Sequence, residues 1–302
     1  MKNKRDFITL LDFSPEELNS LVTRGIELKT ELKTGQINSS LQKKTLAMIF
    51  TLSSTRTRVG FETGMVQMGG HAIYLSPNDS QFGRGEPISD MAKVLSEMVD
   101  AVVIRTLSQS DIEAFAEAAS IPVINAMSSQ WHPCQLLADV QTFVEQRGSI
   151  VGRTVAFIGD GYNMCNSYIN AARQWGFHLK MACPPGHEPD PQLIAKSNNA
   201  ELVSTPEEAV SDADLVVTDV WSSMGHEEHV DARRKTFAGY QVNANLLDMA
   251  PKETLFMHCL PAHRGEEVDE QVLDDPRSVV WQEAGNRLHS QKALLEFLLA
   301  SK

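Results

Sequence analysis

Short apolar runs recur along this chain, and segments whose apolar residues return at helical spacing lie between them. The runs have the length of buried strands and are too short for independent helices. Because strands that alternate with helices form parallel sheets, the pattern predicts an α/β protein. The predicted strands span residues 46–52, 71–76, 101–106, 122–126, 154–160, 178–183, 215–220, 255–260 and 278–283.

The helical segments divide these strands into two groups. Ser14-Pro15-Glu16-Glu17 has the serine N-cap, the first-turn proline and the capping-box glutamate of a helix start. A predicted helix at 134–146 and the turn Arg147-Gly148-Ser149 separate the first four strands from the others. We expect two parallel-sheet α/β domains, over residues 1–147 and 148–285. A last helix, at about 286–302, fits either domain, and packing back on the first is one expectation.

The amino-acid composition indicates the broad class of protein. The chain has 302 residues, enough for two domains with separate cores. Its hydrophobic content of 42% and charged content of 22% are those of a soluble globular protein. No apolar stretch reaches membrane-spanning length, and the basic start at residues 1–6 lacks the apolar core of a signal peptide. We therefore expect a cytoplasmic enzyme with no membrane partner.

The net charge limits the kinds of molecule that the protein is expected to bind. The formal net charge of −12 argues against nucleic acid and anionic membranes. A small anionic substrate stays open, because the field that a substrate meets is local. A positive pocket in this acidic body would draw on Arg56, Arg58, Arg105 and His132.

Cysteine and histidine spacings favour neither a disulfide frame nor a metal site. The cysteines Cys134, Cys165, Cys183 and Cys259 are widely spaced and include no CxxC pair, so reduced thiols are expected. His226-Glu227-Glu228-His229 lacks the HExxH spacing that places two histidines on one helix face. We therefore expect no bound metal.

The segment Ser54-Thr55-Arg56-Thr57-Arg58 is the most informative motif. It follows the apolar run 46–52 and precedes Phe61, Met65 and Met68, which recur at helical spacing. The segment is therefore predicted to lie at a helix N-terminus, where free amides and the helix dipole favour an anion. Its hydroxyls and guanidiniums add donors that suit phosphate oxygens. Taken alone, the segment fits equally well an ordinary capping turn with two solvated arginines.

Other polar residues also fall where predicted strands end. Ligands of open parallel sheets bind beyond the carboxyl ends of the strands, so this recurrence favours a ligand site there. Each residue also has an ordinary interpretation, such as a hydrogen-bonded His132, a small buried Cys259 or a helix-capping Asp219. The residues are Arg105, His132-Pro133-Cys134-Gln135, Asp139, Asn163, Asp219 with Trp221-Ser222-Ser223-Met224-Gly225, and His258-Cys259-Leu260-Pro261.

Gly159-Asp160-Gly161 is similar to the start of a dinucleotide-binding fingerprint. The third glycine of that fingerprint is replaced by Met164, and the residues that follow do not fit it. A nicotinamide-dependent dehydrogenase is therefore disfavoured.

Taken together, the motifs resemble the aspartate/ornithine carbamoyltransferase superfamily. The resemblance covers residues from about 50 to about 288, in the family's order. Two motifs are similar to its carbamoyl phosphate site: Ser54-Thr55-Arg56-Thr57-Arg58 and His132-Pro133-Cys134-Gln135. Three more resemble the second-substrate half of its ornithine-specific members: Asp219, Ser222-Ser223-Met224-Gly225 and His258-Cys259-Leu260-Pro261.

The resemblance implies a reaction and an assembly. The carbamoyl group of carbamoyl phosphate would pass to the δ-amino group of L-ornithine, giving citrulline and phosphate. The amine would attack directly and form a tetrahedral intermediate, and no cofactor would be needed because phosphate is a good leaving group. The resemblance further implies an active site in the cleft between two domains, and a homotrimer or a multiple of trimers.

The resemblance also implies a role for individual residues. Carbamoyl phosphate would be bound by Ser54, Thr55, Arg56, Thr57, Gln81, Arg105, His132, Gln135, Leu260 and Arg287, with Gln81 reaching a neighbouring subunit's site. Ornithine would be bound by Asn163, Asp219, Ser223 and Met224. The catalytic residues would be Arg105, His132, Asp219 and Cys259. His132 would polarise the carbonyl, while Asp219 and Cys259 would lie near the δ-nitrogen. The chain departs from the family at Tyr162-Asn163, where two asparagines are common.

Two other functions stay open. A carbamoyltransferase for another amine, such as putrescine, would be expected to differ in Ser223-Met224-Gly225, which with Asp219 suits an α-amino acid. A catalytically silent regulatory homologue would lack a phosphate-holding residue, and none is missing. The role of Cys259 also stays open between accepting a proton and positioning the amine.

Overall fold

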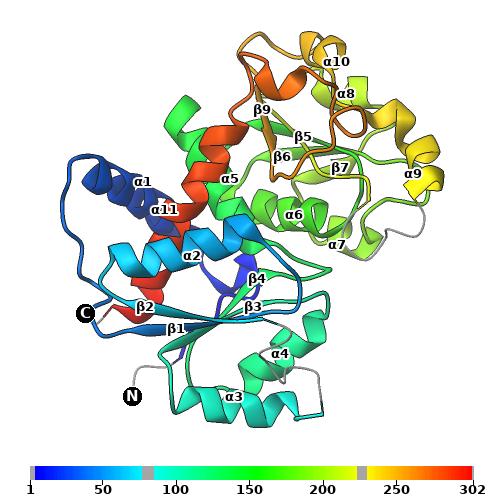
Figure 1. The fold of residues 1–302 in the computed structure, drawn as a ribbon. Helices are drawn as coiled ribbons and strands as arrows, with labels where there is room; N and C mark the ends of the chain where they lie inside the picture. Colours follow the sequence, from blue (N-terminus) through cyan, green and yellow to red (C-terminus); the bar gives the residue numbers. More distant parts are fainter. Residues whose placement is uncertain (1–3, 77–84, 223–229, 301–302) are drawn as a thin grey trace. The chain divides into compact units, whose positions relative to one another are not determined.

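The chain folds into two compact units, each built on its own parallel sheet. The computed structural model describes residues 4–76, 85–222 and 230–300. Unit 1 comprises Met1–Gln141 and Gly285–Lys302, and unit 2 comprises Thr142–Ala284. The predicted α/β class with two parallel sheets is confirmed (Figure 1). Among the residues described, no helix is long and apolar enough to cross a membrane.

The sheet of unit 1 has the strand order β2–β1–β3–β4, with every pair parallel. Its strands are β1 (Thr45–Phe50), β2 (His71–Leu75), β3 (Ala101–Arg105) and β4 (Val123–Met127). Its helices are α1 (Pro15–Lys33), α2 (Thr55–Gln67), α3 (Ile88–Ser96) and α4 (Gln109–Ala118), the first part of α5 (Pro133–Arg147), most of α11 (Val280–Leu299) and the short η1 (Leu10–Asp12).

Helices cover both faces of this sheet. Figure 1 shows α1, α2 and α11 on one face and α3 and α4 on the other. Alternate residues of the central strands, such as Ile49 and Ile104, pack with Phe115 of α4 in a core closed to solvent. The strands of a parallel sheet covered in this way are mostly apolar, and ligands bind beyond their carboxyl ends, which is where the predicted ligand residues lie.

The predicted start of α1 is confirmed in detail. The Ser14 hydroxyl accepts a hydrogen bond from the Glu17 amide at 3.2 Å, and the Glu17 carboxylate accepts one from the Ser14 amide at 2.9 Å. The helix predicted at 134–146 is also present, as α5.

The sheet of unit 2 has the parallel strand order β7–β6–β5–β8–β9. Its strands are β5 (Thr154–Ile158), β6 (His178–Ala182), β7 (Ala200–Leu202), β8 (Leu215–Thr218) and β9 (Leu255–His258). Its helices are α6 (Asn163–Trp175), α7 (Pro191–Ala195), α8 (Pro206–Val210), α9 (Val230–Phe237) and α10 (Ala244–Asp248), with η3 (Ala238–Tyr240) and η4 (Val272–Asp274). Figure 1 shows α8 and α10 on one face of the sheet and α6 and α7 on the other.

One predicted strand of unit 2 is wrong, and one of its strands was missed. The strand predicted at 278–283 is absent, because only Ser278 forms a bridge, to Phe256, and α11 already begins at Val280. The run Val279-Val280-Trp281 is β-prone, but it continues into a long helical pattern that decides its conformation. Strand β7 was not predicted, because its three residues at the sheet edge are too few and too polar to give a strand pattern.

Candidate active site

The motif predicted to hold phosphate does begin a helix. Ser54 is the N-cap of α2, and its hydroxyl accepts a hydrogen bond from the Thr57 amide at 3.4 Å. The same hydroxyl donates to Oγ1 of Thr57 at 3.0 Å, and Thr57 is buried. The first turn of α2, described in full, carries no acidic side chain. The helix dipole and the first amides of α2 therefore favour an anion beside these hydroxyls.

The two arginines of the motif have different surroundings. Arg56 is half-buried, whereas Arg58 is exposed. Arg58 donates to Glu62 at 2.9 Å, and its guanidinium lies 3.8 Å from the centre of the Tyr74 ring. The contacts of Arg58 thus lie on the surface shared by α2 and β2.

Arg287 joins three segments of unit 1 that lie far apart in the sequence. This buried guanidinium, on α11, donates to Oγ1 of Thr57 at 3.0 Å and to Oε1 of Gln135. The Gln135 amide in turn donates to Asp139 at 2.8 Å, one turn along α5. The start of α2, the start of α5 and α11 therefore share one buried polar network.

His132 lies in a strongly positive environment. It precedes α5, and Arg105 ends β3; both side chains are buried. Burial holds the pKa of the His132 imidazole well below its ordinary value of 6.5, and the charges of Arg287, Arg105 and Arg56 lower it further. The ring is therefore neutral, and the three guanidiniums supply the positive charge. Such a cluster is suited to a multiply charged anion that carries a polarisable oxygen.

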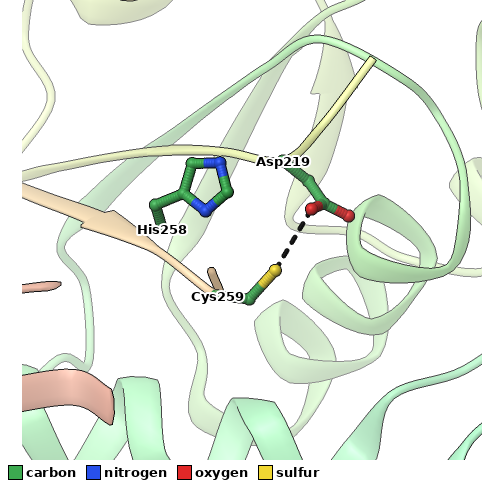
Figure 2. Close-up of side chains that lie close together, drawn as sticks. All are labelled: Asp219, His258 and Cys259. Carbon is green, nitrogen blue, oxygen red and sulfur yellow. Dashed lines mark hydrogen bonds between the residues drawn. The ribbon is translucent and has the colours of Figure 1, made fainter. Parts of the chain in front are cut away.

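In unit 2, Asp219 and Cys259 come together at the ends of adjacent strands. Asp219 follows β8 and Cys259 follows β9, and the Cys259 thiol donates to Oδ1 of Asp219 at 3.1 Å (Figure 2). The Val220 amide donates to the same oxygen at 2.8 Å. Burial raises the pKa of the Asp219 carboxyl above its ordinary range, although the hydrogen bonds donated by the Cys259 thiol and the Val220 amide oppose the shift. Asp219 is therefore a stronger proton acceptor than an exposed aspartate.

His258 holds the turn that carries Cys259 and Leu260. Its Nδ1 accepts a hydrogen bond from the Leu260 amide at 2.8 Å, so the ring proton lies on Nε2, 3.1 Å from the Glu267 carboxylate. The His258 amide donates to Glu283 at 2.9 Å. Both glutamates are buried, and the sequence analysis did not select either of them. Neither glutamate belongs to a sequence motif, because its contact with His258 forms only when the chain folds.

Asn163 begins α6 and is buried. Its carbonyl accepts a hydrogen bond from the Ser167 hydroxyl at 2.7 Å. The turn before it needs glycine at position 161, because a Cβ there would lie 2.3 Å from the backbone nitrogen of Pro189. This close backbone approach accounts for the glycine without a dinucleotide.

The cluster around His132 and the strand ends that carry Asp219 and Cys259 do not account for every predicted residue. Gln81, Ser223 and Met224 lie outside the described residues. Thr55 is exposed in the first turn of α2, and Leu260 lies in unit 2 with a backbone φ of 55°. The remaining predicted site residues belong either to the unit 1 cluster or to the strand ends of unit 2.

Within the described part of the chain, two groups of side chains have donor atoms close enough to hold a metal ion: Asp219 with His258 and Cys259, and His263 with Glu266 and Glu267. In the first group, His258 already uses both ring nitrogens. In the second, Glu266 is paired with Arg234 at 2.5 Å. Neither arrangement favours a cation, because a metal would have to displace these bonds.

Two family models match the chain along nearly its whole length. The aspartate/ornithine carbamoyltransferase carbamoyl-P binding domain matches residues 5–145, and the Asp/Orn binding domain of the same family matches residues 151–298. The chain belongs to the aspartate/ornithine carbamoyltransferase family. The first carbamoyltransferase model contains the positive cluster around His132, except for Arg287, and the second contains Asn163, Asp219 and Cys259.

Individual carbamoyltransferases are similar over the same length. The ornithine carbamoyltransferase of Chromohalobacter salexigens is 57% identical over 99% of this chain and 98% of its own. The anabolic ornithine carbamoyltransferase of Pseudomonas aeruginosa is 56% identical over 98% of this chain and 97% of its own. The solved ornithine carbamoyltransferase of Pyrococcus furiosus superposes with a TM-score of 0.94 at 46% identity, covering 98% of this chain and 97% of its own. The solved enzyme of Burkholderia thailandensis gives a TM-score of 0.91 at 46% identity, covering 98% of each chain.

Proposed function

We propose that this protein is an ornithine carbamoyltransferase, which transfers the carbamoyl group of carbamoyl phosphate to the δ-amino group of L-ornithine and yields citrulline and phosphate. The observation that carries the proposal is the cluster of guanidiniums, buried at Arg105 and Arg287, around a buried and neutral His132 in unit 1. A phosphate dianion joined to a carbonyl group matches the charge and the donors of that cluster. High identity to relatives named ornithine carbamoyltransferase supports ornithine as the acceptor.

Carbamoyl phosphate would bind at the start of α2. The α2 amides, the motif hydroxyls and the guanidiniums of Arg56, Arg105 and Arg287 would hold the phosphate, with Gln81 supplied by a neighbouring subunit and Leu260 also in contact. Gln135 would bind the carbamoyl amino group. Charge-assisted hydrogen bonds are worth about 1.5–3 kcal/mol each, so several arginines can offset the desolvation of a dianion.

Arg105 and His132 would act on the carbonyl oxygen. A neutral imidazole can donate a hydrogen bond there without adding charge, while Arg105 supplies charge that grows in effect as the oxygen becomes anionic. Preorganised donors of this kind commonly contribute about 10²–10³-fold each to the rate.

Ornithine would bind at the strand ends of unit 2. Asn163 and Asp219, with Ser223 and Met224, would hold the α-amino and α-carboxylate end. The δ-amine must lose its proton before it can attack, because an ammonium has no lone pair. Asp219, whose pKa is raised by burial, would receive that proton, and Cys259, which donates to Asp219, would position the amine.

The chemical step then needs no cofactor. The δ-nitrogen lone pair attacks the carbonyl carbon, a C–N bond forms, and the carbonyl π electrons move onto oxygen. When the tetrahedral intermediate collapses, the C–O bond to phosphate breaks, phosphate leaves with the bonding pair, and the nitrogen loses its second proton. Holding both reactants in place supplies further acceleration, since effective molarities of oriented groups reach about 10⁵–10⁸ M.

The test is citrulline formation from carbamoyl phosphate, with ornithine, putrescine, lysine, aspartate and N-acetylornithine as parallel acceptors. Turnover with ornithine alone is expected. Turnover with a different amine would overturn the roles of Asp219 and Asn163 and keep the carbamoyl phosphate site. No turnover with any acceptor would overturn the proposal and favour a regulatory homologue.

We further propose a homotrimer, or a multiple of trimers, in the cytoplasm. Val59 and Val66 lie seven residues apart on one face of α2 and are 55% and 68% exposed. Beside α2, β2 ends the order of its sheet, and Ile73 on it is 40% exposed. An exposed apolar face beside a strand edge suits coverage by a second copy. The four free thiols support a reducing compartment.

The functional domains would follow the family pattern. We assign carbamoyl phosphate binding to residues 1–147 together with the last helix, and ornithine binding to residues 148–285.

A further inference from the structure

The residues proposed to bind ornithine lie on two segments at the ends of adjacent strands. Strand β5 pairs with β8 from Val155–Leu215 to Ile158–Thr218. Beyond β5, the chain passes Asp160 before Asn163 opens α6; beyond β8, it passes Asp219 before Trp221. Neither Asp160 nor Trp221 has a role in the reaction proposed above, yet each is buried.

Arg233, on α9, contacts both of these segments. Its Nη2 donates to the Asp160 carboxylate, and its Nε donates to the backbone carbonyl of Trp221. Its Nη1 lies 3.5 Å from Nδ1 of His187. The side chains of Arg233 and Asp160 are only 11% and 10% exposed. One largely buried guanidinium therefore links the end of β5 to the segment after β8.

One aromatic ring packs against this guanidinium, and two further rings pack against that one. Its carbon lies 4.9 Å from the centre of the Phe237 ring, which is fully buried. The rings of His187 and Trp221 lie 4.7 Å and 5.9 Å from Phe237, centre to centre. Packed in this way, Arg233 has little freedom to adopt another position, in contrast to a surface ion pair.

We propose that Arg233 is a positioning residue, which sets the spacing of Asn163 and Asp219 by holding Asp160 and the Trp221 carbonyl. This inference rests on the proposed function, since it assigns the ornithine site to Asn163 and Asp219. Arg233 acts through the segments that carry them, by its bonds to Asp160 and to the Trp221 carbonyl.

The geometry requires arginine in particular. The planar guanidinium directs Nε to a carbonyl, Nη2 to a carboxylate and Nη1 toward an imidazole at the same time. A lysine ammonium keeps the positive charge but is a single point that cannot reach such divergent acceptors together. Arg233→Lys therefore separates the loss of positioning from the loss of charge.

The experiment compares Arg233→Lys with Arg234→Lys. Arg234 is the adjacent residue on α9, is 54% exposed and pairs with Glu266, so its substitution is the matched control. For Arg233→Lys we expect the KM for ornithine to rise about 10- to 100-fold, with the KM for carbamoyl phosphate within about twofold of wild type. Arg234→Lys should leave both values near those of wild type.

A merely structural role predicts a different result. It would lower the melting temperature and the fraction of active enzyme, and the surviving enzyme would keep its KM for ornithine. That result, or an equal rise of both KM values, would overturn the proposal.

Asp160→Asn decides the question if Arg233→Lys fails to fold. The amide oxygen can still accept one hydrogen bond, so a smaller rise confined to the ornithine KM is expected, and an unchanged KM would overturn the proposal. If wild type turns over another amine instead, the proposed acceptor is wrong, and the same comparison of KM values with that amine tests Arg233 separately.

Discussion

At the scale of single residues, the main feature of unit 1 is a buried histidine among guanidiniums. Arg287, Arg105 and Arg56 all disfavour a proton on His132, and burial disfavours it more. The imidazole is thus a hydrogen-bond donor of fixed protonation state, and its neutral form persists through the physiological pH range.

His132→Ala is expected to lower kcat about 10²–10³-fold, because one donor to the developing oxyanion is lost. The shape of the kcat against pH profile between about pH 6 and 9 should be unchanged, since His132 does not titrate there. Steady-state rates at several pH values check both points. Disappearance of a wild-type inflection near neutral pH in this variant would contradict the neutral assignment.

The hydrogen bond from the Cys259 thiol to Asp219 limits the chemical role of Cys259. It donates to Asp219, so it is held as a neutral donor rather than released as a thiolate nucleophile. We predict that Cys259→Ser, which keeps a donor, retains measurable turnover with an altered KM for ornithine. Mass spectrometry of wild type during turnover should detect no carbamoylated Cys259, and trapping that adduct would refute this role.

Asp160 gives a stability prediction. Burial raises its pKa to about 6 from 3.8, with Arg233 opposing and Asp219 adding to the shift. The folded state therefore keeps a proton that the unfolded chain releases, so the contribution of Asp160 to the free energy of unfolding falls as pH rises through this window. The loss is of order 3 kcal/mol in total.

Asp160→Asn should remove that slope, whatever its effect on absolute stability. Urea unfolding of wild type and variant from about pH 4 to pH 8 measures it. Asp212→Asn, at an exposed carboxylate paired with Lys180, is the control and should keep the wild-type slope. Equal slopes in wild type and Asp160→Asn would show that Asp160 ionises at an ordinary pH.

At the scale of elements, the turn between β5 and α6 has no room for a side chain at residue 161. A Cβ at residue 161 would meet the backbone of Pro189 and Glu188 at 2.3 and 2.5 Å, and backbone cannot move aside as a flexible side chain can. We predict that Gly161→Ala lowers the free energy of unfolding by about 1–3 kcal/mol and raises the KM for ornithine, because the start of α6 must shift.

Gly239→Ala serves as the control for that prediction. A Cβ at residue 239 has no described atom within 4 Å, so the variant should be close to wild type in stability and in KM. Denaturant unfolding and steady-state kinetics of both variants provide the comparison. Equal effects at the two positions would remove the steric argument.

Elements with a local signal could be predicted from the sequence. Ser14 and Ser54 mark helix starts by their capping pattern, and apolar runs mark the central strands. Polar residues after those runs, such as Arg105 and Asp219, could be selected because a parallel sheet collects ligand residues at its strand ends. The resemblance then suggested their roles.

What could not be predicted depends on contacts distant in the sequence. Glu267 and Arg233 have no motif, and only folding brings them to His258 and Asp160. At 278–283, most of the β-prone run forms the start of α11 instead of a strand. Local preference is a weak guide where a longer element or tertiary packing decides the conformation.

At the scale of the whole molecule, the exposed face of α2 and β2 bears on assembly. The double variant Val59→Glu/Val66→Glu is expected to be smaller than wild type by light scattering coupled to size exclusion, because buried carboxylates oppose association. Its citrulline formation should also fall if Gln81 has the proposed role in a neighbouring subunit's site.

Val151→Glu is the control, because Val151 is similarly exposed, at 61%, but lies in unit 2. It should keep both the mass and the activity of wild type. A double variant with the wild-type mass would show that the α2 face is not an interface.

The path of the chain through the two units has a consequence for synthesis. Unit 2 occupies Thr142–Ala284, between the two stretches that make up unit 1. Arg287, which bonds Thr57 and Gln135, therefore emerges from the ribosome only after all of unit 2. Domains can fold while the rest of the chain is still being made. Unit 2 can therefore fold before unit 1 is complete, because most of α11 belongs to unit 1 and is made last. The buried network proposed to bind carbamoyl phosphate is thus begun early and completed last, so a nascent chain halted before α11 would lack the Arg287 bonds even if unit 2 had folded.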